Sequence, residues 1–115
     1  MNVVRFDAAP PYGAPGHDKM HMLRLQGREA GASDVLWLGL SHLLPGGGTT
    51  LDASPLEKMY VVLDGEVTIS NGREEVTLRA WDSCRIAPEE PRALSNRSNR
   101  TATILLAMPL GPAKT

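Results

Sequence analysis

PGGGTTLDASPLEKMYVVLDG, residues 45–65, is the stretch that decides the fold of this 115-residue chain. It holds a proline-glycine run, an extended polar segment, the apolar segment Lys58 to Leu63 and the tight-turn pair Asp64-Gly65. The run at 45–48 predicts a break in the preceding strand, because proline and glycine interrupt regular structure. The short apolar segment after it predicts a β-strand bounded by turns.

Short strands are also predicted on both sides of this stretch. Asn71-Gly72 is the strongest hairpin signal in the chain, because both residues tolerate a positive φ. No segment shows sustained 3.6-residue periodicity, and turn residues recur every eight to twelve residues or so, which is typical of sandwiches and barrels. We therefore predict an all-β fold, with further strands at residues 21–25, 35–44, 66–70, 75–78, 81–86, 93–96 and 101–108.

The strand at residues 35–44 has two apolar faces. Its even-numbered leucines lie with His42 on one face, and Trp37 and Leu43 lie on the other. We expect the leucine face to form the core, which would place His42 inside the fold. Trp37 and Leu43 would then supply an outward apolar patch, a candidate surface for association.

Composition and charge are typical of an ordinary soluble globular protein. Hydrophobic residues make up 42%, charged residues 22%, and the net charge is -1, so neither nucleic acid nor an anionic membrane is expected as a partner. The single cysteine, Cys84, excludes an internal disulfide. No signal peptide or membrane span is recognised, so a cytoplasmic location is predicted.

Three segments are expected. Residues 1–19 form a Pro/Gly-rich N-terminal arm, residues 20–110 the β-barrel and residues 111–115 a C-terminal tail. The arm has two interpretations: a loose tail, or a segment that lies over the barrel or over a partner subunit.

Two motifs resemble those of the cupin family, over about residues 35–108. The first cupin motif is G, five residues, H-x-H, three or four residues, E, six residues, G; anchoring it on Gly65 places Asp52 and Ser54 at the two His positions and Lys58 at the Glu position. The second motif, P-x-G, two residues, H, three residues, N, is similar to residues 88–96, where Arg92 replaces the third His. The resemblance implies a cupin-type double-stranded β-helix, a jelly-roll barrel, in which all the usual metal ligands have been replaced.

The replaced positions change the chemistry of the expected site. Lys58 and Arg92 have no free lone pair while protonated, so they cannot substitute for imidazole ligands of a metal. They suit an anion instead, Arg92 as a planar fork and Lys58 as a point charge. We predict a site of Asp52, Ser54, Lys58 and Arg92 for a small carboxylate or phosphate, with no metal and no cofactor. The alternative is an Asp52–Lys58 ion pair that merely fills the place of the lost metal.

Further candidates lie near these positions. Lys58, Tyr60 and His42 are the candidate acids and bases for lyase or isomerase chemistry that needs no metal. Tyr60 should share the inward face with Lys58, with a core aromatic as the alternative. Cys84 is a candidate pocket residue. Together with His42 and Asp52 it could form a divalent metal site with relocated ligands, against the simpler interpretation of a core histidine and an inert thiol.

Three functions are therefore open at this point. The first is a small-molecule-binding cupin with an anionic ligand, with or without catalytic activity. The second is a non-catalytic interaction module with a vestigial pocket, and the third is a metal enzyme with relocated ligands. The family resemblance implies a homodimer for the first two.

Overall fold

A computed structural model describes residues 1–111 of the chain. This part contains nine β-strands and two short 3-10 helices, joined by turns and loops. The predicted tail beyond residue 111 lies outside the described residues. The elements are η1 (Phe6–Ala8), β1 (Pro11–Tyr12), β2 (His17–Gln26), η2 (Arg28–Ala30), β3 (Leu36–Thr49), β4 (Lys58–Asp64), β5 (Glu66–Ser70), β6 (Glu75–Arg79), β7 (Ser83–Ile86), β8 (Ala93–Ser95) and β9 (Ala102–Pro109). No helix within this range is long and apolar enough to cross a membrane.

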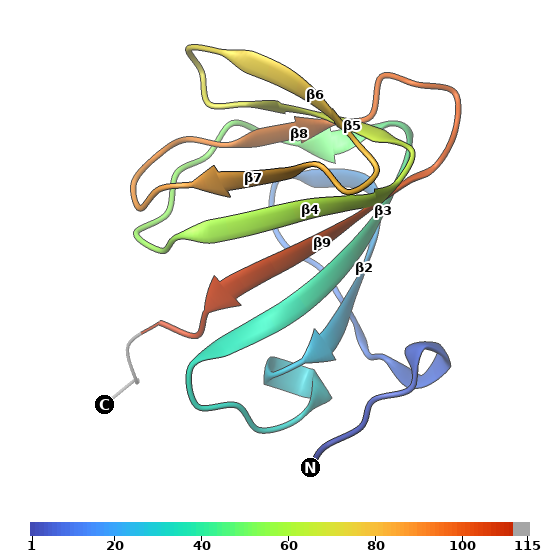
Figure 1. Cartoon of the computed structure of the whole chain (residues 1–115), viewed down its shortest axis with the longest axis vertical. Coiled ribbons are helices and arrows are strands. Elements are labelled where there is room, and N and C mark those ends of the chain that lie inside the picture. The colour runs from blue at the N-terminus through green and yellow to red at the C-terminus, as the bar shows by residue number, and fades with distance from the viewer. Residues whose placement is uncertain (112–115) are drawn as a thin grey trace.

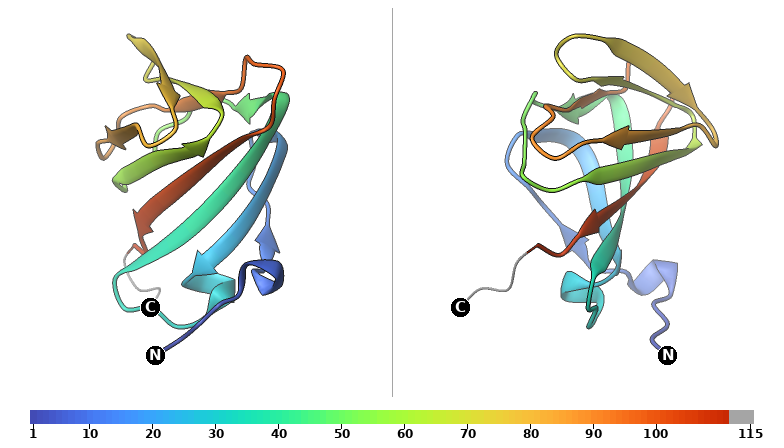
Figure 2. Two further views of the ribbon diagram at one scale, coloured as in Figure 1. Left: turned by 45° about the vertical axis from the view of Figure 1, so that its right-hand side comes forward. Right: turned by 60° about the vertical axis from the view of Figure 1, so that its left-hand side comes forward.

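The strands form one nearly closed antiparallel barrel of the jelly-roll type. The order is β6-β5-β8-β3-β9-β4-β7, and β2 and β1 extend from β3. Figure 1 and Figure 2 show the long strands β2, β3, β9 and β4 side by side, with the β5–β6 hairpin and β8 crossing one end. The predicted all-β barrel is confirmed.

Strand β3 does not end at the proline-glycine run, so the predicted break is wrong. The strand continues to Thr49 and pairs with both β2 and β8 in this region. A Cβ on Gly47 would lie 2.4 Å from the carbonyl oxygen of Lys19, and one on Gly48 would lie 2.1 Å from that of Leu94. The glycines therefore allow neighbouring backbones to approach closely at a corner of the barrel, a known role of glycine inside strands.

The core face of β3 is also the opposite of the one expected. Trp37 and Leu43 are 6% and 0% exposed, whereas Leu36 and Leu44 are 44% and 51% exposed. The outward face is partly covered as well, since the ring of Phe6 packs edge-on against His42 at 6.2 Å. With apolar residues on both faces, alternation alone could not identify the inner one. The expected outward patch of Trp37 and Leu43 does not form.

The core and the hairpin follow the sequence pattern elsewhere. Val67 and Ile69 are both buried, as expected for one face of β5, and they pack in a cluster with residues of β3, β4, β8 and β9. The Asn71 side chain accepts hydrogen bonds from the backbone N–H of Arg73 (3.0 Å) and Glu74 (2.9 Å), which closes the turn between β5 and β6.

The N-terminal segment is attached to the barrel by strand pairing. Pro11 and Tyr12 form β1 and lie opposite Leu23 and Met22 of β2. Strand β2 itself begins at His17. The second half of the predicted arm is therefore positioned against the strands that surround the interior.

Candidate functional site

A cavity of about 190 Å³ lies inside the barrel, between β1, β2, β3, β4, β9 and the start of β8. Its polar walls carry three cationic side chains (Arg24, Lys58 and Arg92), three aromatic ones (Tyr12, Trp37 and Tyr60), and Ser41 and His17. Methionine and leucine side chains complete the lining. No Asp or Glu of the described residues lines it, so the cavity is positive in character.

Lys58 opens strand β4 and is only 4% exposed. Its ammonium donates a hydrogen bond to the hydroxyl of Ser54 at 2.8 Å. Burial, together with the nearby charge of Arg92, lowers the pKa of Lys58 below its usual value. This lysine therefore loses its proton more readily than an exposed one.

Arg92 lies directly before β8 and is 8% exposed. Its backbone forms an antiparallel bridge with Asp52, with N···O distances of 3.1 and 2.9 Å. One guanidinium nitrogen, Nη1, donates to the hydroxyl of Thr49 at 2.7 Å. The Nε atom is buried and has no hydrogen-bond partner among the described residues. An unsatisfied buried donor is unfavourable, and an anionic ligand would satisfy it.

Tyr60 follows Lys58 on the inner face of β4 and is 3% exposed. Burial raises its pKa to about 12, against the opposing effect of Arg92. The phenol is therefore neutral at physiological pH and can both donate and accept a hydrogen bond.

No ion pair neutralises Lys58 or Arg92 within residues 1–111. The ion pairs found there involve Arg24, Arg79, Arg85 and Arg97, and neither Lys58 nor Arg92. The expected alternative, an Asp52–Lys58 pair, is not among them. Asp52 is exposed, and its carboxylate accepts a hydrogen bond from Thr50 instead.

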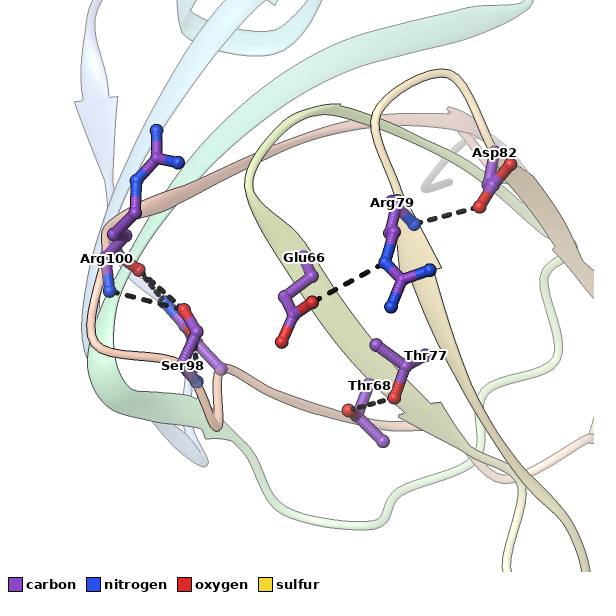
Figure 3. Close-up of polar contacts among 8 residues, drawn as sticks. Glu66, Thr68, Thr77, Arg79, Asp82, Ser98 and Arg100 are labelled. Atoms are coloured by element: carbon purple, nitrogen blue, oxygen red, sulfur yellow. Dashed lines mark hydrogen bonds and ion pairs between the residues drawn. The ribbon is translucent and has the colours of Figure 1, made fainter.

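The polar groups of the β5–β6 hairpin, which lies outside the cavity, contrast with those of the cavity wall. Figure 3 shows Arg79 beside Glu66, at 3.8 Å, and the backbone N–H of Arg79 bonded to Asp82 at 2.9 Å. The hydroxyls of Thr68 and Thr77 bond to each other at 2.8 Å. Polar groups here have partners within the protein, unlike the Nε of Arg92 in the cavity.

Four of the residues proposed from sequence do not line this cavity. Asp52 is exposed, and Ser54 contacts the site only through its hydrogen bond with Lys58. The other two are His42 and Cys84. His42 is on the outer face of β3, where its ring stacks on His21 at 6.3 Å and its Nδ1 lies 3.0 Å from the hydroxyl of Thr103. Cys84 lines a different cleft, beside Glu74 and Glu90, and burial raises the pKa of its thiol. Neither residue is placed to act with Lys58.

The relocated metal site is not assembled. His42, Cys84 and Asp52 do not converge, and no group of three or more His, Cys, Asp or Glu side chains in residues 1–111 could hold a metal ion. The donor set around Lys58 and Arg92 does not suit a transition metal either, since protonated lysine and arginine offer no lone pair.

The sequence did not identify the cavity residues from the N-terminal half. Tyr12 belongs to the predicted arm, Arg24 was placed only on a strand, and Trp37 was assigned to the outer face. Gly39, in the middle of β3, was the available signal, because glycine inside a strand often marks the close approach of another group.

These features define a jelly-roll barrel with an internal, cation-lined cavity. The chain belongs to the cupin family: the family model described as Cupin domain matches residues 39–108. The resemblance predicted from the two motifs is therefore confirmed.

Comparisons with individual proteins agree with this family. The chain is 40% identical over 108 residues to "Beta-D-galactosidase Rv1717" of Mycobacterium tuberculosis, with 94% of this chain and 93% of that protein covered. Among solved structures, it is similar to the polyketide cyclase RemF from Streptomyces resistomycificus, with a TM-score of 0.84, 19% identity, and 96% and 80% of the two chains covered. A predicted oxalate decarboxylase from Thermotoga maritima gives a TM-score of 0.80, 23% identity, and coverage of 95% and 99%. At these identities the two structures show the fold alone.

Proposed function

We propose that this cupin binds a small anionic molecule, a carboxylate or a phosphate, in the cavity formed around Lys58 and Arg92. The observation that carries the proposal is the pair of buried cations with no neutralising carboxylate in the cavity wall. Buried charges are normally paired, and an anionic ligand would provide the missing partner. The free Nε of Arg92 supports the same conclusion.

The same residues could carry out proton transfer on a bound acid. The lowered pKa of Lys58 makes its neutral amine more accessible, and that form can act as a general base while Arg92 keeps the charge that holds the acid. Tyr60, two residues along β4, offers a neutral phenol that can donate a hydrogen bond to the bound acid, although its raised pKa makes it a weak proton donor. A lyase or isomerase reaction without a metal is the chemistry that this pair supports best.

Isothermal titration calorimetry with small carboxylates and inorganic phosphate tests the binding proposal. We expect saturable binding by the unaltered protein and weaker binding by Lys58→Met and Arg92→Met. Arg79→Met is the matched control, because Arg79 is exposed and lies outside the cavity. An affinity that both cavity variants retain would refute the proposed site.

Hydrolysis of a β-galactoside is a second candidate function. It is favoured by the 40% identity to the galactosidase-named relative over nearly the full length of both proteins. Most glycosidases use two carboxylates on either side of the scissile bond, and no carboxylate of the described residues lines this cavity. The geometry therefore supports binding of an anion more directly than this reaction.

Release of nitrophenol from nitrophenyl β-D-galactoside tests this second candidate. Asp52→Asn is the informative variant, since Asp52 is bridged through the backbone to Arg92, which lines the cavity. Turnover that Asp52→Asn abolishes would establish hydrolysis with this carboxylate. No turnover by the unaltered protein would exclude the candidate.

A further inference from the structure

Tyr12 reaches the cavity from strand β1, and two neighbours, Trp37 and Arg24, fix its ring. The ring of Trp37 packs edge-on against it, with centroids 5.9 Å apart and planes at 86°. The guanidinium carbon of Arg24 lies 3.5 Å from the centroid of the Tyr12 ring and 4.3 Å from that of Trp37. Such cation–π contacts hold an aromatic ring in a defined orientation.

Gly39 makes room for the hydroxyl of Tyr12 on the inner face of β3. A Cβ at Gly39 would lie 3.0 Å from the Tyr12 oxygen and 2.6 Å from Cζ3 of Trp37. The two inward neighbours of Gly39, Trp37 and Ser41, both line the cavity. The phenol oxygen of Tyr12 is therefore directed to the interior and not to the surface.

The polar groups of the cavity come from two sides of the barrel. Tyr12 and Ser41 bring hydroxyls from β1 and β3, whereas Lys58 and Arg92 bring positive charge from β4 and the start of β8. Burial raises the pKa of Tyr12, so its phenol is neutral and can donate or accept a hydrogen bond. Lys58 and Arg92 suit an anion, whereas the hydroxyls of Tyr12 and Ser41 suit alcohol groups. Arg24, beside Tyr12, is already paired with Glu29.

We infer that the ligand is a hydroxylated acid, such as a sugar acid, and that Tyr12 determines this specificity by hydrogen-bonding a ligand hydroxyl. The inference rests on the proposed function, because Lys58 and Arg92 bind the acid group. Tyr12 adds selectivity: an acid of the same ring size without hydroxyls would leave its phenol without a partner inside the cavity. Sites that hydrogen-bond a ligand hydroxyl discriminate against analogues that lack it.

Calorimetry with a matched pair of acids, galacturonate and cyclohexanecarboxylate, tests the inference. Both have a six-membered ring and one carboxylate, and only the first has hydroxyls. The unaltered protein should bind galacturonate more tightly. Tyr12→Phe should lower that affinity roughly 3- to 10-fold, the effect of one hydrogen bond, and leave cyclohexanecarboxylate binding unchanged.

The control variant is Thr77→Val, which removes the hydroxyl that bonds to Thr68 on the β5–β6 hairpin, outside the cavity. It should change neither affinity. Equal weakening of both acids by Tyr12→Phe, or no change in either, would overturn the role of Tyr12. Equal affinity of the unaltered protein for the two acids would overturn the ligand class.

Two further probes separate this inference from the proposed function. Inorganic phosphate has no carbon-bound hydroxyl, so its binding should respond to Lys58→Met and not to Tyr12→Phe. D-galactose has hydroxyls and no charge. If it bound in a Tyr12-dependent way while neither acid nor phosphate bound, the anion site would be refuted and the hydroxyl-binding role of Tyr12 would stand.

Discussion

Lys58→Met should strengthen the fold and weaken the site at the same time. Lys58 is 4% exposed, and its ammonium has a hydroxyl group, that of Ser54, as its hydrogen-bond partner at 2.8 Å. No carboxylate among the described residues forms an ion pair with it. The folded protein therefore carries the desolvation penalty of this charge without an opposite charge to offset it.

The size of the effect follows from the burial. Replacing a buried ion pair by well-packed apolar residues of similar volume is often neutral or stabilises a protein by about 1–4 kcal/mol, and the same desolvation penalty applies to the single charge of Lys58. Because Lys58 also faces a cavity, we expect the lower part of that range, about 1–2 kcal/mol, which raises the midpoint of thermal unfolding by about 4–8 °C. Loss of one charge-assisted hydrogen bond to the ligand, about 1.5–3 kcal/mol, should reduce anion affinity roughly 10- to 150-fold.

The stabilisation should depend on pH in a defined direction. The pKa of Lys58 is lowered in the folded state from 10.5, so between the two values the unfolded chain binds more protons and the stability of the unaltered protein rises with pH. Lys58→Met lacks this contribution. Its advantage in stability should be largest below the lowered pKa and should disappear as the pH passes 10.5.

Thermal unfolding followed by circular dichroism, and calorimetry with inorganic phosphate, measure the two effects. Lys19→Met is the matched control, because Lys19 is exposed, and it should change stability by less than about 0.5 kcal/mol. A Lys58→Met protein that unfolds several degrees lower would show that Lys58 is structural. Unchanged phosphate affinity would refute its role in binding.

Three other measurements extend the account. Arg92→Lys keeps the charge and loses the planar fork, so calorimetry should show an affinity for carboxylates between those of the unaltered protein and Arg92→Met; full affinity would contradict binding through the fork. Anion affinity of the unaltered protein should fall as the pH rises through the lowered pKa of Lys58. In Lys58→Arg the loss of affinity should move to higher pH, because arginine keeps its proton. Identical pH profiles of the two proteins would assign the titration to another group. Gly39→Ala would place a Cβ 2.6 Å from the Trp37 ring. We expect denaturant unfolding to show a loss of stability of about 1–3 kcal/mol. An unchanged stability would show that Gly39 does not constrain the Tyr12–Trp37 pair.

The fold was predictable from local signals where one face of a strand is buried and the other is solvated. Val67 and Ile69 identify the inner face of β5, and Asn71-Gly72 identifies the hairpin that follows. Strand β3 carries apolar residues on both faces, because the N-terminal segment covers part of its outer side. Alternation therefore gave the wrong face there, and His42 and Trp37 exchanged their expected places.

The candidate site was accessible from the sequence only in part. Motif spacing drew attention to Lys58 and Arg92, which the structure places on the wall of one cavity. Tyr12 and Arg24 reach the same cavity through pairing of β1 with β2. That contact joins segments which have no signature motif, so it depends on tertiary structure alone. The prediction that Cys84 lies in the pocket was wrong for the same reason, because packing and not motif spacing determines the neighbours of Cys84.

The central claim is that Lys58 and Arg92 hold an anion, and a crystal structure of the protein with bound galacturonate tests it most directly. We predict that the carboxylate oxygens lie about 2.7–3.2 Å from Nζ of Lys58 and from Nε of Arg92. A carboxylate bound away from both cations, or a metal ion in their place, would contradict the account.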